Sequence, residues 1–175
     1  MARRLILYPK SITLVVGPQG RAEKMVELAA SVALRGEVHV LDAGNSFRAF
    51  AAARYVRRRT PRSAEILRRI KVARAFTCYQ VLSLLRKTPE TADPKIVMGL
   101  LSTFGDESVS LEESQRLLEV VVGELFRLRR NAALAVSISR PPQPERAVLF
   151  DFLVSAADRV QREPETTDFT PVRLL

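Results

Sequence analysis

The chain alternates between short apolar runs and longer segments in which apolar residues recur every three or four positions. The apolar runs lie at residues 11–17, 37–43, 70–76, 95–101 and 132–139. The helical patterns span roughly residues 21–34, 46–59, 77–87, 111–131 and 146–157. Runs rich in β-branched and aliphatic residues are typical of parallel strands buried on both faces. Strands alternating with helices predict an α/β three-layer sandwich, a mostly parallel sheet flanked by helices.

The clearest helix follows Ser110, a residue suited to the N-cap position. Glu112 and Glu113 fall in its first turn, and arginines close its last turn, so each sign of charge matches the helix dipole. Near the end of the chain, "DRVQREPE" alternates weakly and is interpreted as an edge strand. No interdomain linker interrupts the pattern, which predicts one domain over residues 1–165 and a loosely attached tail at 166–175.

Composition narrows the class of protein. The chain has 175 residues, of which 47% are hydrophobic, enough for one soluble domain with a real core. No stretch approaches the roughly 18 to 20 continuous apolar residues of a membrane span. The segment "MARRLILYPK" turns polar too soon for a secretory signal. These features predict a cytoplasmic protein with no membrane partner.

A single cysteine, Cys78, and a single histidine, His39, limit the available chemistry. They cannot build a disulfide framework or a Cys/His zinc site. A Ser-His-Asp or Cys-His triad would have to use His39. Because His39 lies inside the apolar pattern "EVHVLDA", a structural strand histidine is the favoured interpretation over a catalytic base.

The net charge of +9 is concentrated in one stretch. Residues 54–74 carry nine basic residues and one acidic residue, while the rest of the chain is close to neutral. Such clusters gain affinity for nucleic acids by releasing counterions. The candidate contact residues are Arg57, Arg58, Arg59, Arg62, Arg68, Arg69 and Lys71. A solvated helix end and a surface for DNA or an acidic protein both remain open.

The turn after the first apolar run resembles a phosphate-binding loop in context but not in chemistry. A P-loop has the form G-x-x-x-x-G-K-[ST] between a strand and a helix. Counted from Gly17, the motif lysine falls on Glu23, and a loop longer by one residue would bring Lys24 to the phosphate. The candidate nucleotide ligands are Gly17, Gln19, Gly20, Arg21 and Lys24. An ordinary tight turn and weak phosphate binding are the two alternatives.

The segment from 38 to 85 carries a family resemblance. Asp42 ends a strand, Phe47 opens the following helix, and "ARAF" at 73–76 leads to Gln80. In this order the residues resemble the core of RecA/RadA-type recombinase ATPases, and the resemblance extends over roughly residues 10–165. "KIVMGLLS" lies where the Walker B strand is expected, and "AALAVSIS" lies where the next strand is expected. The resemblance implies a RecA-like fold, ATP and Mg²⁺ as cofactors, and DNA or a recombinase-like protein as partner.

The resemblance fails at the catalytic positions. The water-activating glutamate of the family is replaced by Gly44, and the Walker B aspartate by Leu101. Asp106 and Glu107 follow the fourth run and are either candidate metal ligands or members of a solvated loop. Asp42 is either a carboxylate on the metal side or, as favoured, a turn-former that caps the next helix.

The family's two DNA-binding loops correspond to residues 102–112, which are acidic, and to 140–146, which contain two prolines. These departures predict a non-catalytic RecA-like accessory or interaction protein linked to DNA repair or recombination. One alternative is an atypical ATPase that uses Lys24 with Asp106 or Glu107. Another is a sequence-independent nucleic-acid binder that uses the basic segment 54–74.

Overall fold

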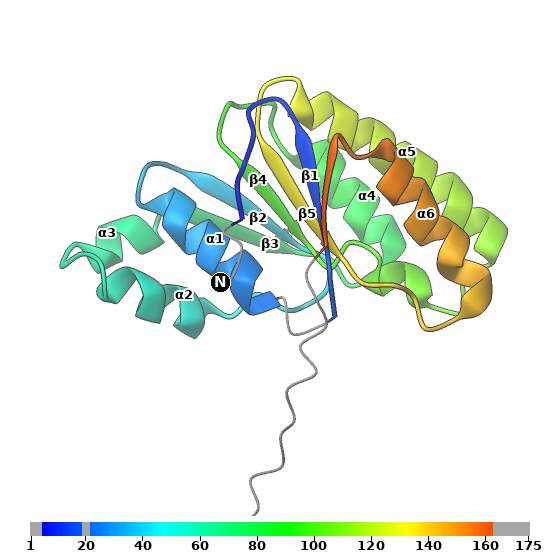
Figure 1. The fold of residues 1–175 in the computed structure, drawn as a ribbon, viewed down its shortest axis with the longest axis horizontal. Helices are drawn as coiled ribbons and strands as arrows, with labels where there is room; N and C mark the ends of the chain where they lie inside the picture. The colour runs from blue at the N-terminus through cyan, green and yellow to red at the C-terminus, as the bar shows by residue number, and fades with distance from the viewer. Residues whose placement is uncertain (1–4, 19–21, 163–175) are drawn as a thin grey trace, which may run out of the picture.

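The computed structural model describes residues 5–18 and 22–162, and its centre is a six-stranded sheet (Figure 1). Every strand pair is parallel, and the strand order is β3-β2-β4-β5-β1-β6. The strands are β1 (Ile12–Val16), β2 (Val38–Asp42), β3 (Ile70–Arg74), β4 (Lys95–Met98), β5 (Leu134–Ile138) and β6 (Arg159–Arg162). The predicted α/β sandwich is confirmed, and the segment interpreted as an edge strand is β6. The predicted tail at 166–175 lies outside the described residues.

Helices cover the two faces of the sheet as separate groups (Figure 1). One face packs against α1 (Ala22–Ala33), α2 (Ala49–Arg57) and α3 (Ser63–Leu67). The other packs against α4 (Cys78–Lys87), α5 (Leu111–Arg129) and α6 (Ala147–Ala156). Two 3₁₀ turns, η2 (Ser102–Gly105) and η3 (Pro144–Arg146), follow β4 and β5. Among the described residues no helix is both long and apolar enough to cross a membrane.

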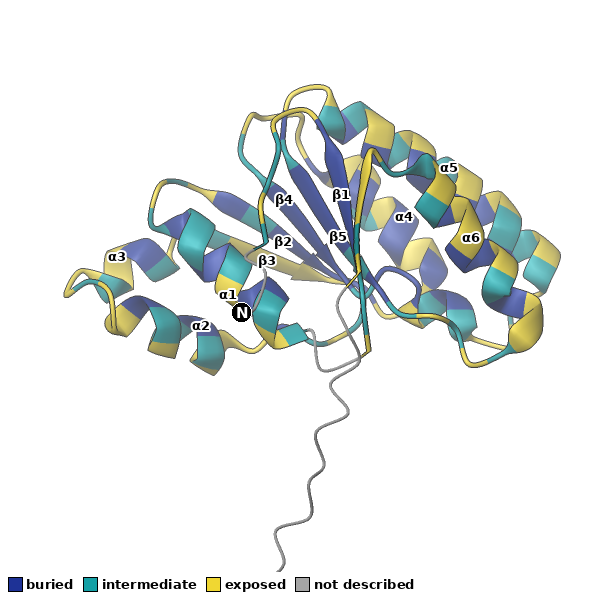
Figure 2. Cartoon of the chain, in the orientation of Figure 1, coloured by how far each residue is buried: buried dark blue, intermediate teal, exposed yellow. Residues whose placement is uncertain are grey.

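Alternate residues of the central strands feed two distinct cores. Leu14 and Val136 pack toward α4–α6, whereas Val15 and Ala135 pack toward α1–α3. This two-sided burial is the physical reason for the near-continuous apolar runs, because neither face of these strands meets water. In Figure 2, β4 is dark blue along its length, and β5 is buried except at Ser137, which is intermediate.

Side-chain caps fix two of the helix starts. The Ser110 hydroxyl accepts a hydrogen bond from the Glu113 backbone N–H at 3.2 Å, which confirms the predicted N-cap of α5. The Thr77 hydroxyl does the same for Gln80 at the start of α4. Each cap satisfies a backbone N–H that has no partner inside its helix. The chain therefore leaves the ends of its strands in defined directions.

The expectation that β3 is buried on both faces is wrong. β3 forms one edge of the sheet, and residues 71–74 are exposed (Figure 2). The 41% exposure of Val72 shows that even an apolar position meets solvent. An apolar run in sequence does not reveal whether a second neighbouring strand covers it. The outer side of β3 therefore has no hydrogen-bonded neighbour among the described strands.

Candidate functional site

A cavity of about 550 Å³ opens at the carboxyl edge of the sheet, where ligands bind in open α/β folds. Four strands contribute to it, because β5 lies between β1 and β4, and β2 lies beside β4. Its described lining includes the backbone of three glycines and a shell of uncharged polar groups. These residues are Gly17, Gly44, Gly99, Asn45, Ser46, Ser102, Ser137 and Ser139.

The turn after β1 is anchored to the end of β5. Gly17 donates its backbone N–H to the Ile138 carbonyl at 3.2 Å, and the Ser139 hydroxyl donates to the Gly17 carbonyl at 2.9 Å. The predicted ligands Gln19, Gly20 and Arg21 lie outside the described residues. On this side of the cavity the described lining resumes at the start of α1, with Ala22 and Glu23.

The first turn of α1 brings a carboxylate to this wall. Glu23 lines the cavity, whereas Lys24 is not among the described residues that do. Glu23 also lies 3.5 Å from the Arg54 guanidinium on α2. A carboxylate at a helix N-terminus is stabilised by the helix dipole, the same field that would attract a phosphate. Glu23 therefore competes with any anion that enters.

Asp42 organises the loop after β2 and does not line the cavity. The residue is fully buried, and its carboxylate accepts backbone hydrogen bonds from Ser46 at 2.9 Å and Phe47 at 3.0 Å. Arg74 donates to the same carboxylate at 3.2 Å and to the Phe47 carbonyl at 3.0 Å. The turn-forming role favoured from the sequence is confirmed, but the predicted capping of the next helix is wrong: α2 begins at Ala49 after Arg48, and Asp42 stabilises the loop that precedes it.

Two backbones touch at the floor of the cavity. A Cβ atom built on Gly99 would lie 2.9 Å from the Gly44 Cα, and Gly99 has a positive φ of 64°. A Cβ atom on Gly44 would lie 3.2 Å from both the Gly99 Cα and the Ser102 Oγ. The Gly99 N–H donates to the Ser137 hydroxyl at 2.9 Å, which ties β4 to β5 here. The position where the resemblance expects a glutamate therefore has little room for any side chain.

The segment after β4 does not direct an acidic side chain into the cavity. Leu101 is buried in the core under α4–α6. The Asp106 carboxylate accepts a hydrogen bond from the Ser108 N–H at 2.9 Å, and hydrogen bonding to Ser108 holds the pKa of Asp106 below its ordinary value. Glu107 lies 3.5 Å from the Gln143 side-chain amide. Neither acid is among the described residues lining the cavity.

Arg146 is an organising residue that the sequence analysis missed. Its side chain is 4% exposed and donates to the Phe104 carbonyl at 2.6 Å and the Ser114 hydroxyl at 3.0 Å. It also donates to the carbonyls of Asp106 at 3.2 Å and Val109 at 2.6 Å. These bonds join the segments after β4 and β5, which correspond to the two DNA-binding loops of the resemblance. An arginine ahead of an apolar helix carries no local signal of such a role.

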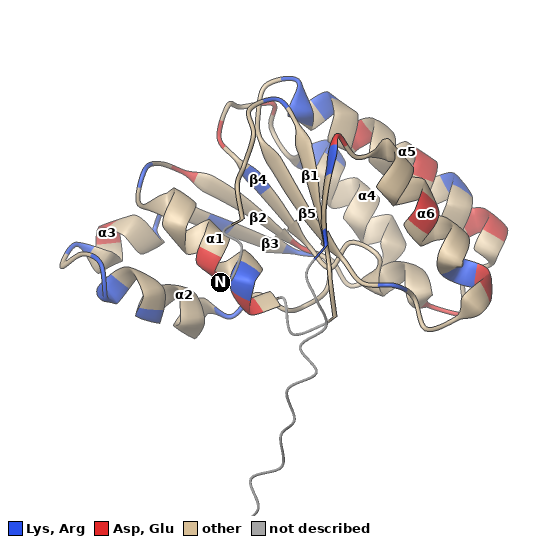
Figure 3. Cartoon of the chain, viewed as in Figure 1, with Lys and Arg blue, Asp and Glu red and all other residues tan. Residues whose placement is uncertain are grey.

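The basic segment divides into free and engaged side chains. Arg59 stacks on the Tyr55 ring at 3.4 Å, Arg69 pairs with Glu65 at 2.8 Å, and the Lys71 ammonium lies 3.9 Å from Glu37. The other four predicted contact residues are exposed and form no ion pair with a described residue: Arg57, Arg58, Arg62 and Arg68. Figure 3 shows these charges at the end of α2 and toward α3.

The single cysteine and histidine lie away from the cavity lining. Cys78 is buried at the start of α4, and burial raises the pKa of its thiol, so the reactive thiolate is disfavoured. His39 lies near the amino end of β2, at the opposite edge of the sheet from the cavity. Neither residue is therefore placed to form a hydrolytic triad in the cavity.

The cavity thus offers hydroxyl, amide and backbone groups. Its described lining contains one acidic side chain, Glu23, and one cationic side chain, Arg48. No protein-family model matches the chain, and no curated protein does.

Proposed function

We propose that the chain is a non-catalytic RecA-like accessory protein that acts by binding a protein partner in DNA repair or recombination. The observation that carries the proposal is the chemistry of the strand-end cavity. Where the resemblance expects a lysine, a metal-orienting aspartate and a water-activating glutamate, the chain has Glu23, Leu101 and Gly44. The cavity lies where the resemblance expects a nucleotide site, and its described lining lacks these groups.

Phosphoryl transfer needs cationic groups on the phosphates, a bound metal and a residue that orients the nucleophile. The described lining of the cavity contains one cationic side chain, Arg48, and the Glu23 carboxylate repels phosphate. Leu101 is buried and cannot ligate a metal. We therefore expect weak nucleotide binding at most, and no hydrolysis.

Calorimetric titration of ATP and ADP, with and without Mg²⁺, tests the first half of the proposal. Wild type should bind no tighter than the high micromolar range and should release no phosphate above a protein-free blank. Glu23→Gln should strengthen ATP binding by about threefold to tenfold, equivalent to about 0.7–1.4 kcal/mol. Glu27→Gln, one turn further along α1 and outside the cavity lining, is the matched control and should leave binding unchanged.

Turnover of ATP that Lys24→Ala abolishes would reject the non-catalytic proposal. It would support the alternative in which Lys24 acts with Asp106 or Glu107. Variants of these two acids would then separate a metal role from a loop role.

Partner binding is assigned to the open edge of the sheet. No described strand pairs with the outer side of β3, so its backbone groups on that side are available to an extended segment. Exposed apolar side chains lie on and beside the strand, with Phe76 at 64% and Tyr79 at 51% exposure. A groove of about 190 Å³ runs between β3 and the end of α4. An added strand from a recombinase-like partner fits this combination.

The purified RecA-type recombinase of the source organism is the probe for this edge. Biolayer interferometry should show saturable binding that Phe76→Ser weakens by about tenfold, the effect of losing about 1.4 kcal/mol. Phe152→Ser removes an exposed aromatic side chain on α6 and is the matched control. Equal binding by wild type and Phe76→Ser, or no binding at all, would reject this assignment.

A second candidate function rests on the four exposed arginines of the basic segment that form no ion pair with a described residue. Their charges are available to a phosphate backbone of any sequence. The affinity for labelled single- and double-stranded DNA, measured by fluorescence anisotropy, should then fall steeply between about 50 and about 200 mM salt. Changing Arg57, Arg58 and Arg62 to Gln should flatten that salt dependence, whereas Arg116→Gln on α5 should not. Salt-independent binding would reject this function.

A further inference from the structure

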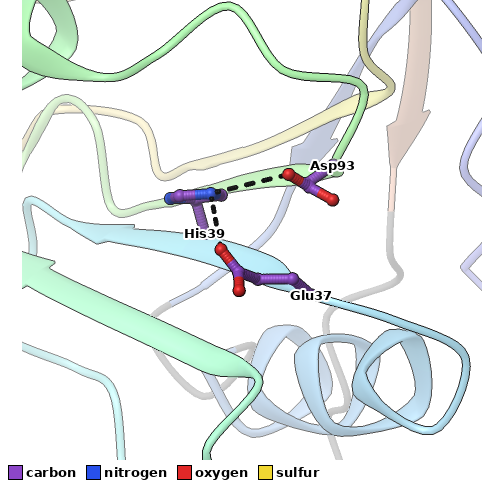
Figure 4. A group of neighbouring side chains, drawn as sticks. All are labelled: Glu37, His39 and Asp93. Atoms are coloured by element: carbon purple, nitrogen blue, oxygen red, sulfur yellow. Dashed lines mark ion pairs between the residues drawn. The ribbon is translucent and has the colours of Figure 1, made fainter.

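Three potential metal ligands converge at the amino edge of the sheet, opposite the cavity (Figure 4). Glu37 precedes β2, His39 lies within β2, and Asp93 precedes β4. β2 and β4 are hydrogen-bonded neighbours, and the His39 N–H donates to the Pro94 carbonyl at 3.0 Å. The pairing of the two strands therefore places the imidazole between the two acidic side chains.

The distances within this group match the spacing of ligands around one ion. The His39 Nε2 atom lies 3.4 Å from the Glu37 Oε1 and 4.0 Å from the Asp93 Oδ2. All three ligand atoms lie within 4.8 Å of one another. In a tetrahedral zinc site, bonds near 2.1 Å place the ligand atoms about 3.4 Å apart. A side-chain rotation of Asp93 that closes its gap to the imidazole would complete this geometry.

The burial of the imidazole nitrogen is a second observation that points to a ligand. Nε2 is inaccessible to solvent and has no hydrogen-bond partner among the described residues, although two carboxylates face it. A buried polar atom without a partner costs free energy, so such an atom calls for an explanation. Nε2 is directed between the two carboxylates without a well-aligned hydrogen bond to either, as a metal ligand would be.

The surroundings hold the three ligands and leave a route to solvent. The Lys95 ammonium is buried and donates to the Asp93 carbonyl at 2.7 Å and the Thr91 carbonyl at 2.6 Å, which fixes the loop that carries Asp93. The Lys71 ammonium lies 3.9 Å from the Glu37 Oε2, the oxygen that does not face His39. The Glu37 and Asp93 side chains are 43% and 37% exposed, so an ion can reach the site from the side of the two carboxylates.

We propose that Glu37, His39 and Asp93 bind a divalent transition-metal ion of the zinc class. One imidazole nitrogen and two carboxylate oxygens suit such an ion, and water would complete its coordination. The two lysine ammonium groups nearby oppose the positive ion, so the expected affinity is micromolar. The bound ion would link the start of β2 to the loop before β4.

NMR of the full chain tests the site directly because His39 is the only histidine. Titration with ZnCl₂ should shift the imidazole signals with a single saturable transition at micromolar metal. Glu37→Gln and Asp93→Asn should each weaken this transition by about tenfold or more. Glu119→Gln, an exposed acid on α5, is the matched control and should leave it unchanged.

The wild-type spectrum decides the question even if a variant fails to fold. Imidazole signals that stay fixed up to millimolar Zn²⁺ would overturn the proposal and leave a histidine paired only with its carboxylates. A zinc transition that Glu37→Gln and Asp93→Asn leave intact would also overturn it, because the metal would then bind elsewhere.

Discussion

The contact between Gly44 and Gly99 at the floor of the cavity provides a sharp test of the fold. Gly99→Ala places a Cβ atom 2.9 Å from the Gly44 Cα on a residue whose φ is 64°. The left-handed conformation costs an alanine about 1–2 kcal/mol. The Ser102 Oγ lies 3.0 Å from the same Cβ position and can rotate away, but the clash with the Gly44 Cα must be relieved by moving backbone. Such overpacking costs about 1–3 kcal/mol.

Together these effects should lower the free energy of unfolding by about 2–5 kcal/mol, a large part of the 5–15 kcal/mol typical of a domain. Urea unfolding followed by circular dichroism measures this loss as a shift of about 1–2 M in the midpoint. Gly123→Ala is the matched control, since nothing lies within 4 Å of a Cβ atom added there on α5. It should raise stability by up to about 1 kcal/mol, because alanine favours a helix interior over glycine.

Gly44→Ala separates the two contributions to the cost at Gly99. Its Cβ atom would lie 3.2 Å from the Gly99 Cα and the Ser102 Oγ. Gly44 does not have a positive φ, so an alanine there carries no cost for a left-handed backbone. A loss of about 1–2 kcal/mol is therefore expected, smaller than at Gly99. A Gly99→Ala protein as stable as wild type would refute the close contact and the shape of the cavity floor derived from it.

Three further perturbations probe residues that hold the site in place. Arg146→Met should destabilise the protein by about 3–5 kcal/mol in urea unfolding, because buried carbonyl groups lose their donor. The exposed Arg130→Met should change stability by less than about 1 kcal/mol. Ser110→Ala should cost about 1 kcal/mol through loss of the α5 cap, seen in the same assay. Hydrogen bonds from Arg129 and Ile12 lower the pKa of Asp158, so its stabilisation should be present at neutral pH and fade as pH falls below about 4. Asp158→Asn should therefore be less stable than wild type at neutral pH, with a difference that shrinks in acid.

The sequence predicts the elements well because their cause is local. Each central strand is apolar on both faces, and each long helix has an apolar stripe, so the pattern identifies five strands and the helices between them. The turn at Gly17, singled out from the sequence as a candidate phosphate-binding loop, also lines the cavity at the carboxyl edge of the sheet. These features depend on the order and period of residues along the chain.

Features that depend on distant neighbours could not be predicted in this way. The exposure of β3 follows from its place at the edge, which the pattern of residues 70–74 does not encode. The contact of Gly44 with Gly99 and the bonds of Arg146 to the loop after β4 join segments far apart in sequence. A glycine or an arginine at such a position carries no local sign of its partner.

The three residues at the expected catalytic positions each have a structural role of their own. Glu23 lies 3.5 Å from Arg54, Gly44 abuts Gly99, and Leu101 packs in the core under α4–α6. Placing a carboxylate at position 101 would bury a charge, and a side chain at position 44 would push two backbones apart. These two changes toward the pattern of the resemblance would therefore cost stability before they added any chemistry. This packing is consistent with the proposed non-catalytic cavity, and function is better sought at the β3 edge, where side chains are accessible, and at the amino-edge cluster, where the His39 Nε2 has no hydrogen-bond partner among the described residues.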